Sequence, residues 1–113
     1  MKFLMLVCRD ESIAFSPEER AGIGPQVQAW VAEMQERGVR LLGEVLAPSE
    51  RTSTVRVRDG EVLVDQGPRG EKPAPPSGFN LIECEDLDEA IEVSAKHPIA
   101  RFGEIELRPY AEG

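Results

Sequence analysis

Residues 79–94, FNLIECEDLDEAIEVS, decide the fold because they join a strand directly to a helix. The run 79–84 is apolar and too short for a helix, so it predicts a buried strand. Asp86 then stands where a helix cap is expected, with Glu89 three residues later as its capping-box partner. The helix should end before Pro98. Its apolar face is predicted to comprise Leu87, Ala90, Ile91 and Ser94.

The first part of the chain has the same order of a strand and a helix. Residues 2–8 (KFLMLVC) predict a short buried strand, and Ser16 with Glu19 gives a second capping-box signature. We expect a break at Pro25, which two nearby glycines precede, and a restart that ends at Gly38. The apolar face after the break is predicted to comprise Val27, Trp30, Val31 and Met34.

Between these two halves the sequence predicts a hairpin and a long loop. Further strands are predicted at 39–46, 52–58, 61–65 and 104–108. The pair Asp59-Gly60 is a strong signal for a tight turn that joins two of these strands. Residues 66–78 contain four prolines and three glycines, which predicts an extended loop.

The resulting order, β-α-β-β-β-β-α-β, is typical of an α+β domain. Without the hairpin it is a ferredoxin-like split β-α-β sandwich, with an antiparallel sheet and both helices on one face. The opposite face of the sheet then needs a cover, and a second copy of the chain is the expected one, which makes a homodimer. The apolar residues that suggest this cover are Leu4, Leu6, Leu42, Val62, Val64, Leu81, Ile105 and Leu107.

Composition narrows the class of protein. The chain has 113 residues, of which 21 are acidic and 13 basic, so residues 1–113 suit a single domain with a net charge of −8. An acidic balance disfavours a nucleic-acid partner, and no apolar run is long enough to predict a membrane span. Cys8 and Cys84 lie in strand-like runs, as is typical of reduced cytoplasmic thiols. No phosphate-binding glycine loop, dinucleotide fingerprint or metal-ligand spacing is present, so no cofactor and no metal are expected.

His97 is the only histidine, and imidazole is the side chain that most readily moves protons near neutral pH. It falls in the predicted last turn of the second helix. One interpretation makes it a catalytic acid or base in a cleft. The other makes it a cap that binds the final helix carbonyls and the negative end of the helix dipole.

Charged side chains on strands and in the loop supply the other candidates. Glu44 and Arg56 lie on neighbouring predicted strands, where Arg56 could clamp an anion and Glu44 act as a base, or the two could form an ion pair. Arg108 is a further candidate anion holder, or an exposed edge charge. Glu71, in the proline-rich loop, is a candidate catalytic base, or a turn acid.

A series of short motifs runs in order along nearly the whole chain. They are Gly43-Glu44-Val45-Leu46-Ala47-Pro48, Thr54-Val55-Arg56, Asp59-Gly60, Gly67-Pro68, Gly78-Phe79, Asp86-Leu87-Asp88-Glu89-Ala90, Pro98, Gly103 and Glu106-Leu107-Arg108-Pro109. Together they resemble the YCII-related family, and most closely its branch named for an Asp-Gly-Pro-Phe (DGPF) motif. At the signature itself this chain departs from the branch, because it has Gln66-Gly67-Pro68-Arg69 instead.

The resemblance implies a ferredoxin-like fold that pairs through its sheets into a dimeric α+β barrel. It implies no single reaction, since relatives range from lyase-like enzymes to proteins linked to alternative sigma factors. We therefore expect a small acid–base enzyme, lyase-like or isomerase-like, that acts on a small anionic molecule in a cleft. The alternatives are a non-catalytic small-molecule sensor and an interaction module for a transcription regulator such as a sigma factor.

Overall fold

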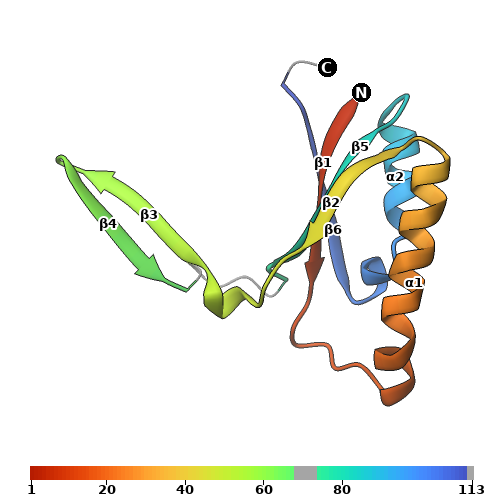
Figure 1. The fold of residues 1–113 in the computed structure, drawn as a ribbon, viewed down its shortest axis with the longest axis horizontal. Coiled ribbons are helices and arrows are strands. Elements are labelled where there is room, and N and C mark those ends of the chain that lie inside the picture. Colours follow the sequence, from red (N-terminus) through yellow and green to blue (C-terminus); the bar gives the residue numbers. More distant parts are fainter. Residues whose placement is uncertain (68–73, 112–113) are drawn as a thin grey trace.

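The computed structural model describes residues 1–67 and 74–111. Within them, the sheet contains β1 (Lys2–Arg9), β2 (Arg40–Val45), β5 (Pro76–Glu83) and β6 (Gly103–Pro109), all antiparallel, in the order β2-β5-β1-β6. The helices α1 (Pro17–Glu36) and α2 (Leu87–Ala95) lie on one side of this sheet (Figure 1). The α+β class and the element order are as predicted, and the arrangement is consistent with a ferredoxin-like fold.

The inserted hairpin does not join the main sheet. Strands β3 (Ser53–Arg58) and β4 (Glu61–Gln66) pair only with each other in the described residues and project on the side of the sheet opposite the helices (Figure 1). Their turn is the predicted one, because Asp59 and Gly60 both have positive φ, 52° and 78°. A short 3₁₀ turn, η1 (Ser49–Arg51), which the sequence reading missed, leads into the hairpin.

Helix α1 begins as predicted and continues where a break was predicted. The Ser16 hydroxyl accepts from the backbone N–H of Glu19 at 3.1 Å, and the Glu19 carboxylate accepts from the backbone N–H of Ser16 at 2.8 Å. The predicted break is wrong, because Pro25 lies inside one continuous helix. A proline removes one helical hydrogen bond, and the burial of Trp30 and Met34 against the core offsets that loss. No described helix is long and apolar enough to cross a membrane.

Helix α2 is capped as predicted, but it presents a different face to the core. The Asp86 carboxylate accepts from the backbone N–H of Glu89 at 2.9 Å, whereas the Glu89 side chain binds the N–H of Glu85, so the capping box is wrong. Leu87 and Ile91 are about half exposed. The buried residues of this helix are Ala90, Val93 and Ser94. Ala90 and Ser94 belong both to the predicted apolar face and to the face that is buried. The buried face continues through Val93, and not through Leu87 and Ile91 as predicted.

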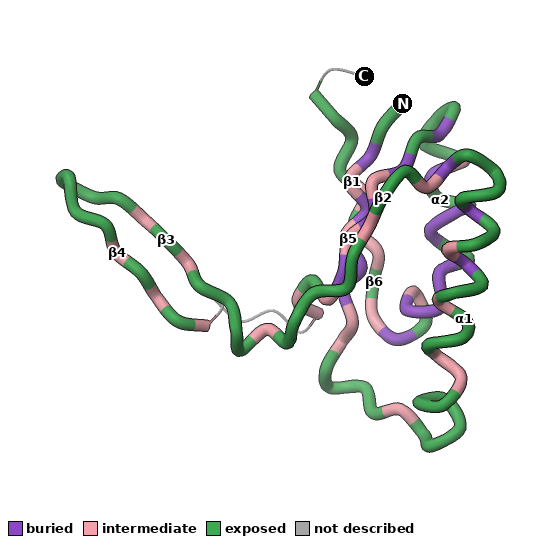
Figure 2. Tube along the Cα trace, in the orientation of Figure 1, coloured by how far each residue is buried: buried purple, intermediate pink, exposed green. Residues whose placement is uncertain are grey.

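The core lies between the sheet and the helices (Figure 2). Phe3, Met5 and Val7 alternate along β1 and point into it. Ile105 and Leu107 also pack on this side, so their predicted place on the opposite face is wrong, and Val62 and Val64 lie on the hairpin. The opposite face, which we call the outer face, is defined by Leu4, Leu6, Leu42, Phe79 and Leu81.

Candidate functional site

A cleft of about 530 Å³ opens between α1 and the edge of the sheet formed by β2 and β5. Its walls are mostly apolar. These side chains come from the middle of α1, from the ends of β1 and β2, and from Phe15 and Ile99. Two arginines, Arg9 and Arg40, line the same space together with His97, and all three can donate hydrogen bonds to an anion. Such a mixture of apolar wall and few polar groups is typical of a small-molecule site.

Arg40 is held in place by a buried amide. Its Nε donates to Oδ1 of Asn80 at 2.8 Å, and Asn80 is only 6% exposed. Within the described residues, neither terminal nitrogen of Arg40 has a hydrogen-bond partner in the structure. The guanidinium is thus oriented through one edge, while its Nη groups are left to bind a ligand.

Gly43 makes this arrangement possible. It lies opposite Asn80 in the β2–β5 register. A Cβ atom at this position would collide with Oδ1 of Asn80, and would lie 2.6 Å from the carbonyl oxygen of Phe79 and 2.8 Å from Nη2 of Arg40. Only glycine therefore leaves room for the Arg40 side chain to lie across β2 toward Asn80.

Arg9 supplies a second guanidinium in the cleft. Its Nη2 donates to the carbonyl of Ile13 at 3.3 Å, and its Cζ lies 4.3 Å from the centre of the Phe15 ring. Its Nε is buried and has no hydrogen-bond partner. The chain between β1 and α1 therefore fixes Arg9 by one backbone bond and one cation–π contact.

His97 lies after the end of α2 and is 4% exposed. Its Nδ1 accepts from the backbone N–H of Ile99 at 3.1 Å, so it caps the short turn η2 (Pro98–Arg101) and not the carbonyls of α2. Burial lowers the pKa of His97 to about 4, and the ring is neutral at pH 7. With Nδ1 used as an acceptor, the proton of the neutral ring resides on Nε2, which makes His97 a hydrogen-bond donor.

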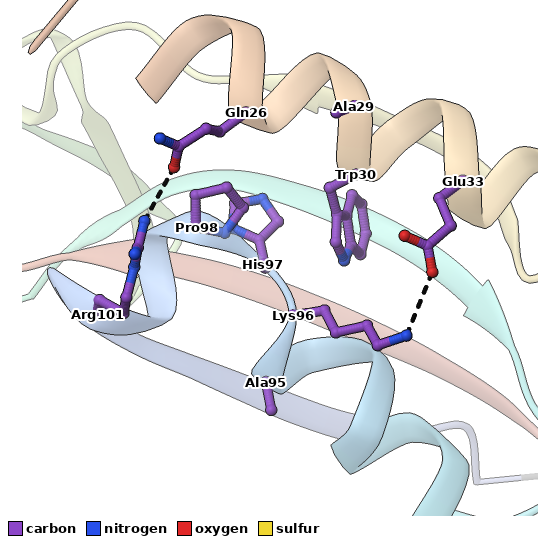
Figure 3. A pocket seen from close by; sticks show the side chains of 9 residues that line it. All are labelled: Gln26, Ala29, Trp30, Glu33, Ala95, Lys96, His97, Pro98 and Arg101. Atoms are coloured by element: carbon purple, nitrogen blue, oxygen red, sulfur yellow. Dashed lines mark hydrogen bonds and ion pairs between the residues drawn. The ribbon is translucent and has the colours of Figure 1, made fainter. Parts of the chain in front are cut away.

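His97 also separates the cleft from a second hollow. This groove, of about 400 Å³, lies between α1 and the segment 95–101 (Figure 3). Two polar bridges span it: Arg101 donates to Gln26 at 2.9 Å and Lys96 donates to Glu33 at 3.3 Å. The side chains that could meet a ligand there already bind each other, so the groove is a weaker candidate than the cleft.

The other predicted site residues are dispersed. Glu44 is exposed and pairs with Phe79 in the β2–β5 register, so its side chain lies on the outer face of the sheet and not in the cleft. Arg56 lies on the hairpin and pairs with Asp65 at 2.9 Å. The prediction that Glu44 and Arg56 lie on neighbouring strands is wrong, because β2 pairs with β5 while β3 pairs with β4. Arg108 lies opposite Leu4, exposed, and away from the cleft.

Glu71 lies outside the described residues, as do residues 68–73 of the loop predicted at 66–78. The ends predicted for this loop are wrong, because Gln66 belongs to β4 and residues 76–78 belong to β5. Sequence reasoning missed Arg9, Arg40 and Asn80. The signal that could have indicated the last two is Gly43, because a glycine inside a predicted strand often marks the close approach of another group.

Cys8 and Cys84 are both buried and free. Burial raises the pKa of the Cys84 thiol to about 11, so it is protonated at neutral pH and a poor nucleophile. Among the described residues, no group of three histidine, cysteine, aspartate or glutamate side chains could hold a metal ion.

The structure is therefore that of a small α+β domain with both helices on one face and a cleft at the β2–β5 edge of its sheet. The chain belongs to the YCII-related family, whose model matches residues 1–112. It is 34% identical over 117 residues to an uncharacterised protein of Rhizobium meliloti (strain 1021), covering 98% of this chain and 93% of that protein. Assignment to the DGPF branch stays a prediction, because the family model that matches is that of the YCII-related domain and does not distinguish this branch.

Proposed function

We propose that this protein binds a small organic anion, a carboxylate attached to an apolar body, in the cleft between α1 and the sheet. The observation that carries the proposal is Arg40, whose guanidinium is oriented by Asn80 over Gly43 with its terminal nitrogens unused. An arginine of fixed geometry can bind a carboxylate through two parallel hydrogen bonds. The chain as a whole has a net charge of −8, so two arginines, Arg9 and Arg40, that line one cleft stand out from the acidic composition.

The lining of the cleft supports an apolar body on the ligand. Val27 and Val31 of α1 line the cleft together with Ile23 of the same helix. A volume of about 530 Å³ is within the range of drug-sized ligand sites. Neutral His97 lines the same cleft and offers its Nε2–H group as a donor, with no charge beyond those of Arg9 and Arg40. These features favour binding without turnover, since a ring that is neutral, buried and already accepting at Nδ1 is a poor general base.

The test uses isothermal titration calorimetry with 2-naphthoate and its neutral analogue 2-naphthamide. We expect 2-naphthoate to bind at least about tenfold more tightly than 2-naphthamide, because a charge-assisted bidentate hydrogen bond is lost in the amide. Arg40→Gln should remove this preference. Arg58→Gln, which removes a cation at the end of the hairpin, is the control and should leave both affinities unchanged.

Three results would contradict the proposal. One is equal binding of the acid and the amide to the wild-type protein, which would make the cleft a purely apolar pocket. A second is a preference for the acid that survives in Arg40→Gln and disappears in Arg58→Gln, which would place the anion site on the hairpin. An absence of heat with both probes, together with no change in the amide NMR spectrum, would also count against the cleft.

We also propose that the protein is a homodimer paired through the outer face of the sheet. Leu4, Leu6 and Leu81 lie there on adjacent strands, and both described helices are on the other side (Figure 1). Leu81→Asp should convert the dimer to a monomer in sedimentation equilibrium. Leu87→Asp places the same charge on the exposed side of α2 and should not. A wild-type monomer at all accessible concentrations would refute the dimer.

A further inference from the structure

The β3–β4 hairpin has an exposed apolar face. Directly paired residues of a hairpin lie on the same face, so the pairs Val55–Val64 and Val57–Val62 form one row of side chains. Their exposed fractions lie between 54% and 67%. We call these four residues the valine face. A two-stranded hairpin on its own is marginally stable in water, so this element gains order from anything that covers the valine face.

The chain has more surface than a compact monomer of its mass. It exposes 7620 Å², whereas a monomer of 12.5 kDa exposes about 6,200 Å². The excess of roughly 1,400 Å² is larger than the ~800 Å² that each partner buries in a standard interface. The radius of gyration is 15.9 Å, against about 13 Å for a compact domain of this length. The hairpin is the element that projects from the rest of the chain (Figures 1 and 2).

The direction of the hairpin indicates what covers it. It projects on the side of the sheet opposite the helices, which is the side of the outer face (Figure 1). A molecule seated on Leu4, Leu6 and Leu81 therefore lies in the angle between the sheet and the hairpin. An occupant of that angle contacts two aliphatic surfaces at once, the partly exposed leucines of the outer face and the hairpin.

We propose that the hairpin is a dimerisation arm, whose valine face packs on the second copy of the chain. The inference rests on the proposed dimer through the outer face. A second copy seated there under two-fold symmetry receives one hairpin and contributes its own to the first copy, so every contact occurs twice. The arm thus extends the sheet-to-sheet interface and supplies the cover that each hairpin lacks in the single chain.

The experiment compares dimer dissociation constants by sedimentation equilibrium. The test variant is the double substitution Val55→Thr and Val64→Thr, which keeps the β-branched shape that favours a strand and removes apolar surface from the valine face. The matched control is Leu63→Thr, on the opposite face of the same strand. We expect the dissociation constant to rise at least about tenfold in the double variant, because each change acts twice in the dimer, and less than about twofold in the control.

Hydrogen exchange of residues 53–66 provides a second readout that does not depend on any substitution. In the wild-type protein these amides should be protected at concentrations where the dimer is populated and should exchange rapidly on dilution. A dimer that resists Val55→Thr with Val64→Thr and leaves these amides unprotected would refute the arm and leave the outer-face dimer intact. A protein that is monomeric at all accessible concentrations would refute both the outer-face dimer and the arm. The binding of 2-naphthoate to the cleft is a separate measurement and depends on neither.

Discussion

The rings of Trp30 and His97 meet edge to face, with their centroids 4.8 Å apart. Trp30 comes from the middle of α1, and His97 follows α2 directly, so this contact joins the two helical segments. Both rings line the cleft and the groove behind it. Because Trp30 is the only tryptophan of the chain, its fluorescence reports on unfolding and on the surroundings of His97.

The first prediction concerns the stability of the fold against pH. Burial lowers the pKa of His97 from 6.5 to about 4, so between these values the unfolded chain binds more protons than the folded one. The contribution of His97 is therefore fully present above pH 6.5 and is lost as the pH falls toward 4. Between about pH 7.0 and pH 4.5 it amounts to about 2 kcal/mol of unfolding free energy.

Urea denaturation followed by Trp30 fluorescence at these two pH values measures the loss. Carboxylates titrate in the same range, so the comparison is with His97→Asn, whose side-chain oxygen can still accept from the backbone N–H of Ile99. The variant should lose about 2 kcal/mol less than the wild type on acidification. Equal losses in the two proteins would mean that His97 is not held neutral in the folded state.

The second prediction concerns the hydrogen bond that anchors Trp30. Its Nε1 donates to the carbonyl of Val93 at 3.0 Å, in the core between α1 and α2. Trp30→Phe leaves that carbonyl without its donor and should lower the unfolding free energy by about 1–3 kcal/mol, measured by circular dichroism in urea. Met34→Leu, one turn further along the same buried stripe, conserves volume and should cost less than about 1.5 kcal/mol. A smaller loss for Trp30→Phe than for Met34→Leu would contradict the assigned bond.

The sequence predicted those features that a few neighbouring residues determine. The Ser16–Glu19 capping box and the Asp59-Gly60 turn depend on side chains and φ values within four residues, and both are present. The break predicted at Pro25 failed because α1 is stabilised by packing on the core, which is a property of the whole domain and not of the local sequence.

The site was less predictable because its contacts are long-range. Arg40 and Asn80 are 40 residues apart and meet only because β2 pairs with β5 in one particular register. Alternation of polar and apolar residues predicted the strand that contains Arg56, but it carries no information about which sheet a strand joins. His97 was found because a single histidine is conspicuous, and its role as a donor depends on burial that the sequence does not show.

The third prediction concerns the ion pairs between α1 and α2. The carboxylate of Glu92 accepts from both terminal nitrogens of Arg37, at 3.0 and 3.2 Å, and pairs with Lys96 at 3.1 Å. The hydrogen bonds from Arg37, followed by those from Lys96, lower the pKa of Glu92 to about 2. Their stabilisation is present above pH 4.5 and disappears as the pH falls through the lowered pKa.

A carboxyl-detected NMR titration should place the pKa of Glu92 higher in Arg37→Gln than in the wild type, and still below 4.5 because Lys96 remains. The unfolding free energy should change little, since all three side chains are in contact with solvent. Added salt should raise the wild-type pKa of Glu92 by screening. An unchanged pKa in Arg37→Gln would show that Arg37 does not bind Glu92 in solution.

The fourth prediction separates the two roles of glycine in this fold. Gly43→Ala places a methyl group against Oδ1 of Asn80 and the carbonyl of Phe79, so β2 or the Arg40 side chain must move. Overpacking of this kind should lower the unfolding free energy by about 1–3 kcal/mol. Gly22→Ala is the control: it lies inside α1, where an added Cβ would meet only the flexible side-chain amide of Gln26 at 3.3 Å, and should raise the unfolding free energy by about 0.5–1 kcal/mol.

The variant Gly43→Ala also tests whether the glycine is needed for binding at the proposed site. If Gly43 allows Asn80 to orient Arg40, the folded fraction of Gly43→Ala should bind 2-naphthoate as weakly as Arg40→Gln does, even when low temperature keeps the variant fully folded. Urea denaturation and calorimetry on the same sample distinguish the loss of stability from the loss of affinity. Wild-type affinity in a destabilised Gly43→Ala protein would mean that the bond between Arg40 and Asn80 is not what prepares the cleft for an anion.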